Sequence, residues 1–199
     1  RISWQNVEPP SRTVYSDQVT GMVKMEDRII LLLDFEKIVG ELCSQSALKP
    51  VDDAELLERE PDANRSQRTI LVADDSHFIR GTMCGTLRGA GYVVEEAENG
   101  AIAWEIIQNK LAQSAQDGSD VRGKLSLLIT DVEMPQMDGL HLTSLVRKNE
   151  GLKGLPVVIF SSLASEDNKR KWIGLGANHI LTKPDLPNLV KVADELAGI

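Results

Sequence analysis

The chain has 199 residues, of which 42% are hydrophobic, so it is long enough for one domain of ordinary size and a second, smaller unit. Its 22 basic and 30 acidic side chains give a net charge of −8, which argues against nucleic-acid binding because that function needs clustered Lys and Arg. The longest aliphatic run, residues 29–33, is far shorter than the roughly 20 residues that cross a bilayer, so we expect no membrane insertion.

The two cysteines, Cys43 and Cys84, are too far apart in the sequence to form a metal-binding knuckle. Lone thiols of this kind are typical of a reducing compartment. No signal peptide begins the chain. We therefore expect a cytoplasmic protein.

The N-terminal part has the pattern of a β-hairpin followed by a helix. Residues 19–25 and 28–33 are predicted strands, joined by a turn at residues 26–27. Asp34 is placed to cap a helix that begins at Phe35. A hairpin and one helix bury too little apolar area to be stable alone, so we expect this part to need more protein, which would lie upstream.

Residues 46–67 have the composition of a linker. The segment contains Pro50 and Pro61, is rich in acidic residues and has few large apolar ones. A short helix is predicted over residues 54–58. The segment is otherwise interpreted as a solvated spacer.

The remaining sequence alternates short apolar runs with helical patterns, which predicts a parallel sheet with helical crossovers. The predicted strands are residues 70–73, 92–97, 125–130, 157–160 and 180–182. The first predicted helix is capped by Ser76 and is ended by Gly89 and Gly91. The other predicted helices are residues 101–111, 140–148, 166–175 and 189–196. Residues 112–124 are predicted to form a polar loop.

Polar side chains follow four of these strands directly. They are Asp74 and Asp75, Asp131, Ser161, and Lys183. Because ligands bind beyond the carboxyl ends of parallel strands, we expect these side chains to meet at one edge of the sheet. Three nearby carboxylates repel one another unless a cation lies among them, and an all-oxygen site suits a hard ion such as Mg²⁺.

The stretches ILVADDS, LLITDVEMPQMDGL, LPVVIFSS and ILTKP resemble the receiver domain of two-component response regulators. The resemblance covers residues 68–199. It implies an α/β fold, a doubly wound five-stranded parallel sheet of the flavodoxin and receiver type with strand order 2-1-3-4-5.

The resemblance also implies a role for each site residue. Asp131 is the predicted phosphoacceptor, because a carboxylate beside a divalent metal can attack phosphorus while the metal offsets charge repulsion. Asp75 is expected to bind Mg²⁺ directly and Asp74 through water, and the backbone carbonyl of Glu133 supplies another ligand. We expect this group to catalyse its own phosphorylation and dephosphorylation, without turnover of an external substrate.

Lys183 is expected to pair first with the carboxylates and then with the phosphoryl group, to which Ser161 donates a hydrogen bond. Pro184 takes a cis peptide bond in the family. Ile180 departs from the family pattern, since many receivers carry a switching Tyr or Phe there, so an aromatic switch at that position is excluded. The histidines His77, His141 and His179 share no metal-ligand spacing and are interpreted as structural.

A second resemblance lies in VTGMVKMEDRIILLLDFEKIV, which is similar to the C-terminal strands and closing helix of a CheW-like domain. A CheW-like domain followed by a receiver is the arrangement of CheV-type chemotaxis coupling proteins. We therefore expect three segments: a CheW-like remnant at residues 1–45, a linker at 46–67 and a receiver at 68–199. An unrelated hairpin ahead of a receiver is the alternative.

These resemblances imply a chemotaxis signalling adaptor. Its expected partners are a CheA-type histidine kinase and, through the full CheW-like domain, chemoreceptors in membrane arrays. Phosphorylation would alter the coupling between receptor and kinase, or drain phosphoryl groups. Two alternatives stay open: a stand-alone receiver that acts on another protein, and an aspartyl-phosphate phosphohydrolase, for which the sequence offers no cap domain.

Overall fold

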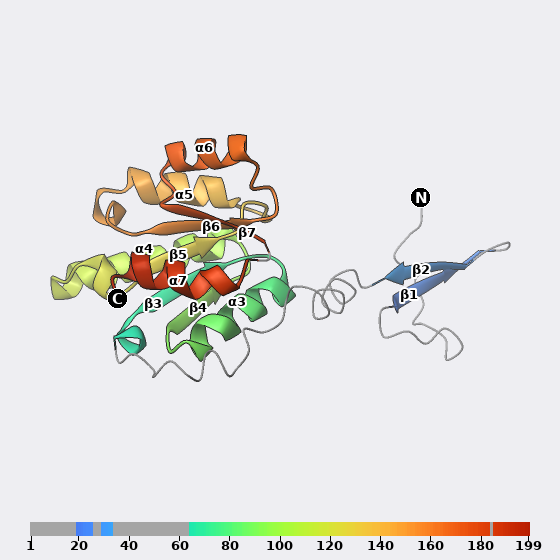
Figure 1. Ribbon diagram of the computed structural model, residues 1–199, viewed down its shortest axis with the longest axis horizontal. Helices are drawn as coiled ribbons and strands as arrows, with labels where there is room; N and C mark the ends of the chain where they lie inside the picture. Colours follow the sequence, from blue (N-terminus) through green and yellow to red (C-terminus); the bar gives the residue numbers. More distant parts are fainter. Residues whose placement is uncertain (1–18, 26–28, 34–63, 184) are drawn as a thin grey trace. The chain divides into compact units, whose positions relative to one another are not determined.

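The computed structural model describes residues 19–25, 29–33, 64–183 and 185–199. The chain divides into two units, Arg1–Lys49 and Pro50–Ile199 (Figure 1). The described part of the first unit is an antiparallel pair, β1 (Val19–Lys24) and β2 (Ile29–Leu33). The predicted β-rich N-terminal segment is thus confirmed, whereas the predicted turn at 26–27 and the helices at Phe35 and 54–58 lie outside the described residues.

The second unit contains a five-stranded parallel sheet with the order β4-β3-β5-β6-β7. Its strands are β3 (Thr69–Ala73), β4 (Val93–Ala97), β5 (Leu127–Thr130), β6 (Val157–Ser161) and β7 (His179–Thr182). Numbered within this unit, the order is 2-1-3-4-5, which confirms the predicted doubly wound topology. The three central strands are almost wholly buried, as expected for strands with a helical layer on each face.

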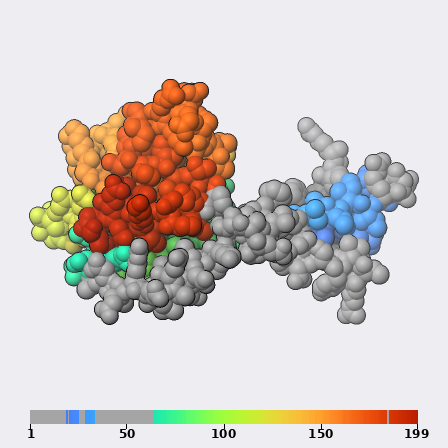
Figure 2. Space-filling view, in the orientation of Figure 1, coloured from blue at the N-terminus to red at the C-terminus, as the bar shows by residue number. Residues whose placement is uncertain are grey.

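Five helices alternate with these strands. They are α3 (His77–Gly89), α4 (Gly100–Asp117), α5 (Gly139–Lys148), α6 (Glu166–Leu175) and α7 (Pro187–Ala197). Helix α3 contacts α7, while α4 contacts α5 and α5 contacts α6, so two helical layers enclose the sheet. In Figure 2, the side chains of α6 and α7, in orange and red, cover much of the visible face of this unit.

Four of the helices begin at a side-chain cap that follows a strand or loop. The caps and the amides that donate to them are Ser76 and Ile79, Asn99 and Ile102, Asp138 and His141, and Ser165 and Asn168. Each cap satisfies a backbone N–H that has no partner within its helix. The predicted cap at Ser76 is therefore confirmed.

Helix α4 is longer than the sequence predicted. The expected helix ended at Leu111, but the observed one continues to Asp117 and ends at Gly118, whose φ of 69° is left-handed. The added turns are mostly exposed and contain Ala and Gln, which favour helix without giving an apolar pattern. The prediction of a loop at residues 112–124 is thus wrong for the first half of that range. A short 3₁₀ turn, η3 (Val121–Gly123), lies in the second half.

One cluster of the hydrophobic core lies between the sheet and helices α4 and α5. It includes Leu71, Ile107, Leu128 and Leu142, all with no exposed surface, and Trp104 packs against it. A second cluster surrounds Trp172 of α6. Both tryptophans therefore pack helices, as predicted. Among the residues described, no helix is both long and apolar enough to cross a membrane.

Candidate functional site

Three aspartates meet at the carboxyl ends of two neighbouring strands. Asp74 and Asp75 follow β3, and Asp131 follows β5, which pairs with β3 in parallel. One carboxylate oxygen from each lies within 4.8 Å of the others. Asp74 and Asp131 are buried, and Asp75 is exposed. The structure thus brings together the three carboxylates that the sequence placed at one edge.

Lys183 joins this group from β7, at the far edge of the sheet. Its Nζ atom lies 2.8 Å from Asp74 Oδ2 and 2.9 Å from Asp131 Oδ2, so one ammonium bridges two carboxylates. The same Nζ lies 6.0 Å from the centre of the Phe160 ring. Because the lysine faces both carboxylates, it offsets part of their mutual repulsion.

Burial and charge act in opposite directions on the two members of this pair. Burial raises the pKa of the Asp74 carboxyl above its usual value, and the Lys183 ammonium only partly counters this effect. Burial alone would lower the pKa of Lys183, but the carboxylates of Asp74 and Asp131 outweigh it and raise the pKa overall. Lys183 is therefore held in its charged form at neutral pH.

Both carboxylate oxygens of Asp74 face a donor. Its Oδ1 accepts a hydrogen bond from the backbone N–H of Ser76 at 2.9 Å. Its Oδ2 is buried and faces the Lys183 ammonium at 2.8 Å. This paired carboxylate, next to the exposed carboxylate of Asp75, fits a hydrated hard cation that Asp75 contacts.

The loop from Asp131 to α5 is closely packed against the site. Asp131 Oδ1 accepts a hydrogen bond from the Val132 N–H at 2.7 Å, and the buried Thr130 hydroxyl donates to the Asp131 carbonyl at 2.9 Å. A Cβ atom added at Gly139 would lie only 1.8 Å from that carbonyl oxygen. The close approach explains why glycine stands where α5 begins.

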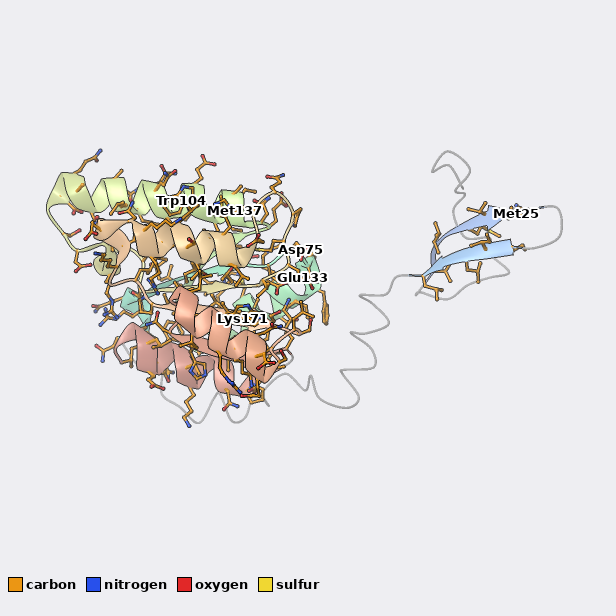
Figure 3. All side chains as sticks on the ribbon, turned by 90° about the horizontal axis from the view of Figure 1, so that it is seen from above. Met25, Asp75, Trp104, Glu133, Met137 and Lys171 are labelled. Carbon is orange, nitrogen blue, oxygen red and sulfur yellow. The ribbon has the colours of Figure 1, made fainter. Side chains whose placement is uncertain are left out.

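Glu133 lies in the connection after β5, and Ser161 lies at the carboxyl end of β6. The Glu133 side chain is exposed, and in Figure 3 it is seen at the same end of the receiver as Asp75. Ser161 ends β6 and is buried, and its Oγ accepts a hydrogen bond from the Leu163 N–H at 3.2 Å. The Lys183 N–H donates to the Ser161 carbonyl at 3.2 Å, which places the two residues side by side. Pro184 lies outside the described residues.

Sequence reasoning missed two residues next to the site. One is Thr130, whose contact with Asp131 depends on the loop that follows it. The other is Arg80, whose guanidinium donates to the backbone carbonyl of Asp74. A basic residue in the first turn after an acidic pair is a weak signal, since such residues are common on exposed helices. The three histidines belong to no metal-binding group among the residues described.

Residues 70–194 match the family model for the response regulator receiver domain. The chain belongs to that family. It is also similar over its whole length to the chemotaxis protein CheV3 of Helicobacter pylori, with 31% identity over 205 residues. This match confirms the resemblance to CheV-type proteins. The chain spans 61% of the length of that relative.

Several other matches cover about the length of the receiver alone. The chemotaxis protein CheY1 of Helicobacter pylori is 32% identical over 61% of this chain and 90% of its own length. Among solved structures, chemotaxis protein CheY4 of Vibrio cholerae has 30% identity and a TM-score of 0.52, covering 65% of this chain and 98% of its own. The receiver domain of the histidine kinase CKI1 from Arabidopsis thaliana, complexed with Mg²⁺, has 30% identity and a TM-score of 0.58 over 66% of this chain and 92% of its own.

Proposed function

We propose that this protein is a chemotaxis signalling adaptor whose receiver accepts a phosphoryl group on Asp131 from a CheA-type histidine kinase. The observation that carries the proposal is the convergence of Asp75, Asp131 and Lys183 within one acidic site. The similarity to CheV3 over the whole chain supports the chemotaxis role. No turnover of an external substrate is expected.

The residues suit Mg²⁺, which Asp75 would bind directly, Asp74 through water and Glu133 through its backbone carbonyl. When bound, the ion neutralises charge on the incoming phosphoryl oxygens. An Asp131 carboxylate oxygen attacks the phosphorus of a phosphohistidine on the kinase. The new oxygen–phosphorus bond forms as the phosphorus–nitrogen bond breaks, and the electron pair of the broken bond stays on the imidazole nitrogen.

Lys183 and Ser161 act on the product of that step. The Lys183 ammonium already lies 2.9 Å from Asp131 Oδ2, so it can pair with a phosphoryl oxygen after a small movement. Ser161 lies beside Lys183, and its hydroxyl is free to turn and donate to the same group. A shift of Ser161 would move the loop to α6 and change the surface that partners meet.

The output is a change in the coupling between chemoreceptors and the kinase, or drainage of phosphoryl groups from the kinase. The β1–β2 pair would belong to the CheW-like part, which would engage the receptors and kinase. The proposed segments are the remnant at 1–45, the linker at 46–67 and the receiver at 68–199. The protein would lie in the cytoplasm at the receptor arrays.

A stand-alone receiver that acts on another protein is the second candidate. The observation that favours it is the similarity to CheY1, which covers 90% of that relative but only the receiver of this chain. Binding of the whole chain to a CheW-like partner domain would favour the adaptor. Binding by the receiver alone, equal to that of the whole chain, would favour the second candidate.

The phosphorylation itself is tested by intact mass after incubation with phosphoramidate and MgCl₂. We expect one labile phosphoryl adduct, which is absent in Asp131→Asn and in EDTA. Asp167→Asn, an exposed carboxylate on α6, is the matched control and should keep the adduct. An adduct of equal yield in Asp131→Asn would contradict the assignment.

A further inference from the structure

Arg80 reaches from helix α3 back to the end of strand β3. Its Nη1 donates a hydrogen bond of 2.7 Å to the backbone carbonyl of Asp74. The side chain is only 12% exposed, so the bond is largely shielded from water. A charged donor on a backbone carbonyl is a stronger bond than a neutral one. Arg80 therefore holds the turn that carries the two acidic residues.

The other side of the guanidinium faces Glu96, in strand β4. Arg80 Nε lies 3.5 Å from Glu96 Oε2, and Arg88 Nη2 lies 2.8 Å from Glu96 Oε1. Glu96 thus fixes Arg80 from a neighbouring strand and offsets its positive charge. The offset matters because an uncompensated cation this close to the carboxylates would oppose the binding of a second cation.

Asp75 is the carboxylate that most needs such support. It is exposed, and no hydrogen bond or ion pair to another described residue orients its side chain. The carbonyl of Asp74 and the N–H of Asp75 belong to one planar peptide group. By holding that carbonyl, Arg80 also holds the orientation of the peptide plane that leads into the Asp75 backbone.

We infer that Arg80 is a positioning residue for the cation site, acting through the Asp74–Asp75 peptide and held by Glu96. The inference rests on the proposed function, because it assumes that Asp75 is a metal ligand. An oriented ligand loses less conformational freedom on binding than a free one. Removal of Arg80 should therefore weaken cation binding without removing any carboxylate.

The test is a titration of the whole ¹⁵N-labelled chain with MgCl₂, followed by the amide signals near Asp75 and Asp131. We expect Arg80→Ala to raise the dissociation constant for Mg²⁺ about tenfold, the size typical when a residue that orients a metal ligand is removed. Arg80→Lys should give an intermediate value, since an ammonium can donate to the carbonyl but cannot also span to Glu96. Glu96→Gln should also weaken binding.

Arg88→Ala is the matched control. Arg88 lies on the same helix and pairs with the same Glu96, but its other bond goes to the Val94 carbonyl and not to Asp74. The dissociation constant of Arg88→Ala for Mg²⁺ should stay within twofold of the wild-type value. The unfolding midpoint of each variant in EDTA separates lost stability from lost affinity, and Arg80→Lys and Glu96→Gln carry the test if Arg80→Ala does not fold.

Two outcomes would overturn the inference in different ways. Equal Mg²⁺ affinity in wild type and a folded Arg80→Ala, or an equal loss in Arg88→Ala, would remove Arg80 from the site while leaving the site intact. Wild type that shows no Mg²⁺-dependent shifts, or shifts that persist in Asp75→Asn, would overturn the metal site itself and the inference with it.

Discussion

At the scale of single residues, the site depends on how much water each charged group keeps. Asp74 has no exposed surface, and its ion pair with Lys183 supplies the positive charge that water would otherwise screen. Asp75, one residue later, is exposed. One strand end thus carries a carboxylate buried against a lysine and another open to a hydrated cation.

Cys84 gives a prediction at the same scale. The thiol lies on α3 with no exposed surface, and burial, aided by the nearby charge of Glu96, raises its pKa to about 12. The native protein should therefore react with a maleimide at pH 8 far more slowly than protein unfolded in urea. Mass spectrometry measures the rate at which the free thiol is lost. The experiment uses the Cys43→Ser variant so that only the Cys84 thiol is counted.

The pKa of Cys84 also sets the sign of a pH effect. Because the pKa of Cys84 in the folded protein is above the ordinary thiol value of 9.0, the protonated thiol favours the folded state fully below pH 9, and this stability is lost as the pH rises toward 12. Cys84→Ala should therefore lose stability relative to the wild type at pH 7, and the difference should shrink at alkaline pH. Native Cys84 that reacts as fast as the unfolded thiol at pH 8 would contradict its burial.

At the scale of elements, helix starts and strand ends place the reacting groups. The β5–α5 connection brings Gly139 against the Asp131 carbonyl, while Gly81 and Gly85 in α3 have no atom within 4 Å of an added Cβ. Two kinds of glycine therefore occur in these helices. One permits a close backbone approach, and the other leaves open space.

This contrast gives a paired prediction. Gly139→Ala should lower the free energy of unfolding by about 2 kcal/mol or more, because the backbone beside Asp131 must shift. Gly81→Ala should raise it by about 0.5–1 kcal/mol, because alanine favours a helix over glycine. Urea denaturation measures both. A Gly139→Ala protein as stable as the wild type would show that the connection can relax without cost.

At the scale of the whole second unit, one buried arginine ties the turn just before β3 to the last helix. Arg65 lies in the 3₁₀ turn η2 (Arg65–Gln67), and its Nε and Nη2 each donate to an Asp194 carboxylate oxygen at 2.8 Å. Its Nη1 donates to the Ala90 carbonyl, and the Tyr92 hydroxyl donates to Asp194. The residues just before β3 are therefore packed against α7.

Arg65→Ala should lower the free energy of unfolding by about 2–3 kcal/mol, since it leaves a partly buried Asp194 without its cation. The matched control is Arg68→Ala, because the bond from the Arg68 side chain to the Gly198 carbonyl is exposed and 3.4 Å long. Its effect should be under about 0.5 kcal/mol. Equal urea midpoints for the two variants would show that the Arg65 pair contributes no net stability.

The local sequence patterns predicted a parallel sheet and the edge at which Asp74, Asp75, Asp131 and Lys183 gather, while the resemblance to receiver domains supplied the strand order. The sheet and its edge could be predicted because buried parallel strands are short apolar runs, and the residue after each run must lie at the carboxyl edge. The same local patterns predicted the cap at Ser76 and the extent of α6. The clearest failure is helix α4, which continues beyond Leu111 without large apolar residues, and the predicted starts of β5 and α7 also differ from the observed ones.

The sharing of charge within and around that edge depended on contacts between elements. The bridging of Asp74 and Asp131 by Lys183, the bond from Arg80 to the Asp74 carbonyl and the pairing of Arg65 with Asp194 each join residues from different elements. A long charged side chain can reach several partners. The partner that it pairs with depends on which of them the packing shields from water. That shielding is a property of the assembled layers, which no single segment of the sequence contains.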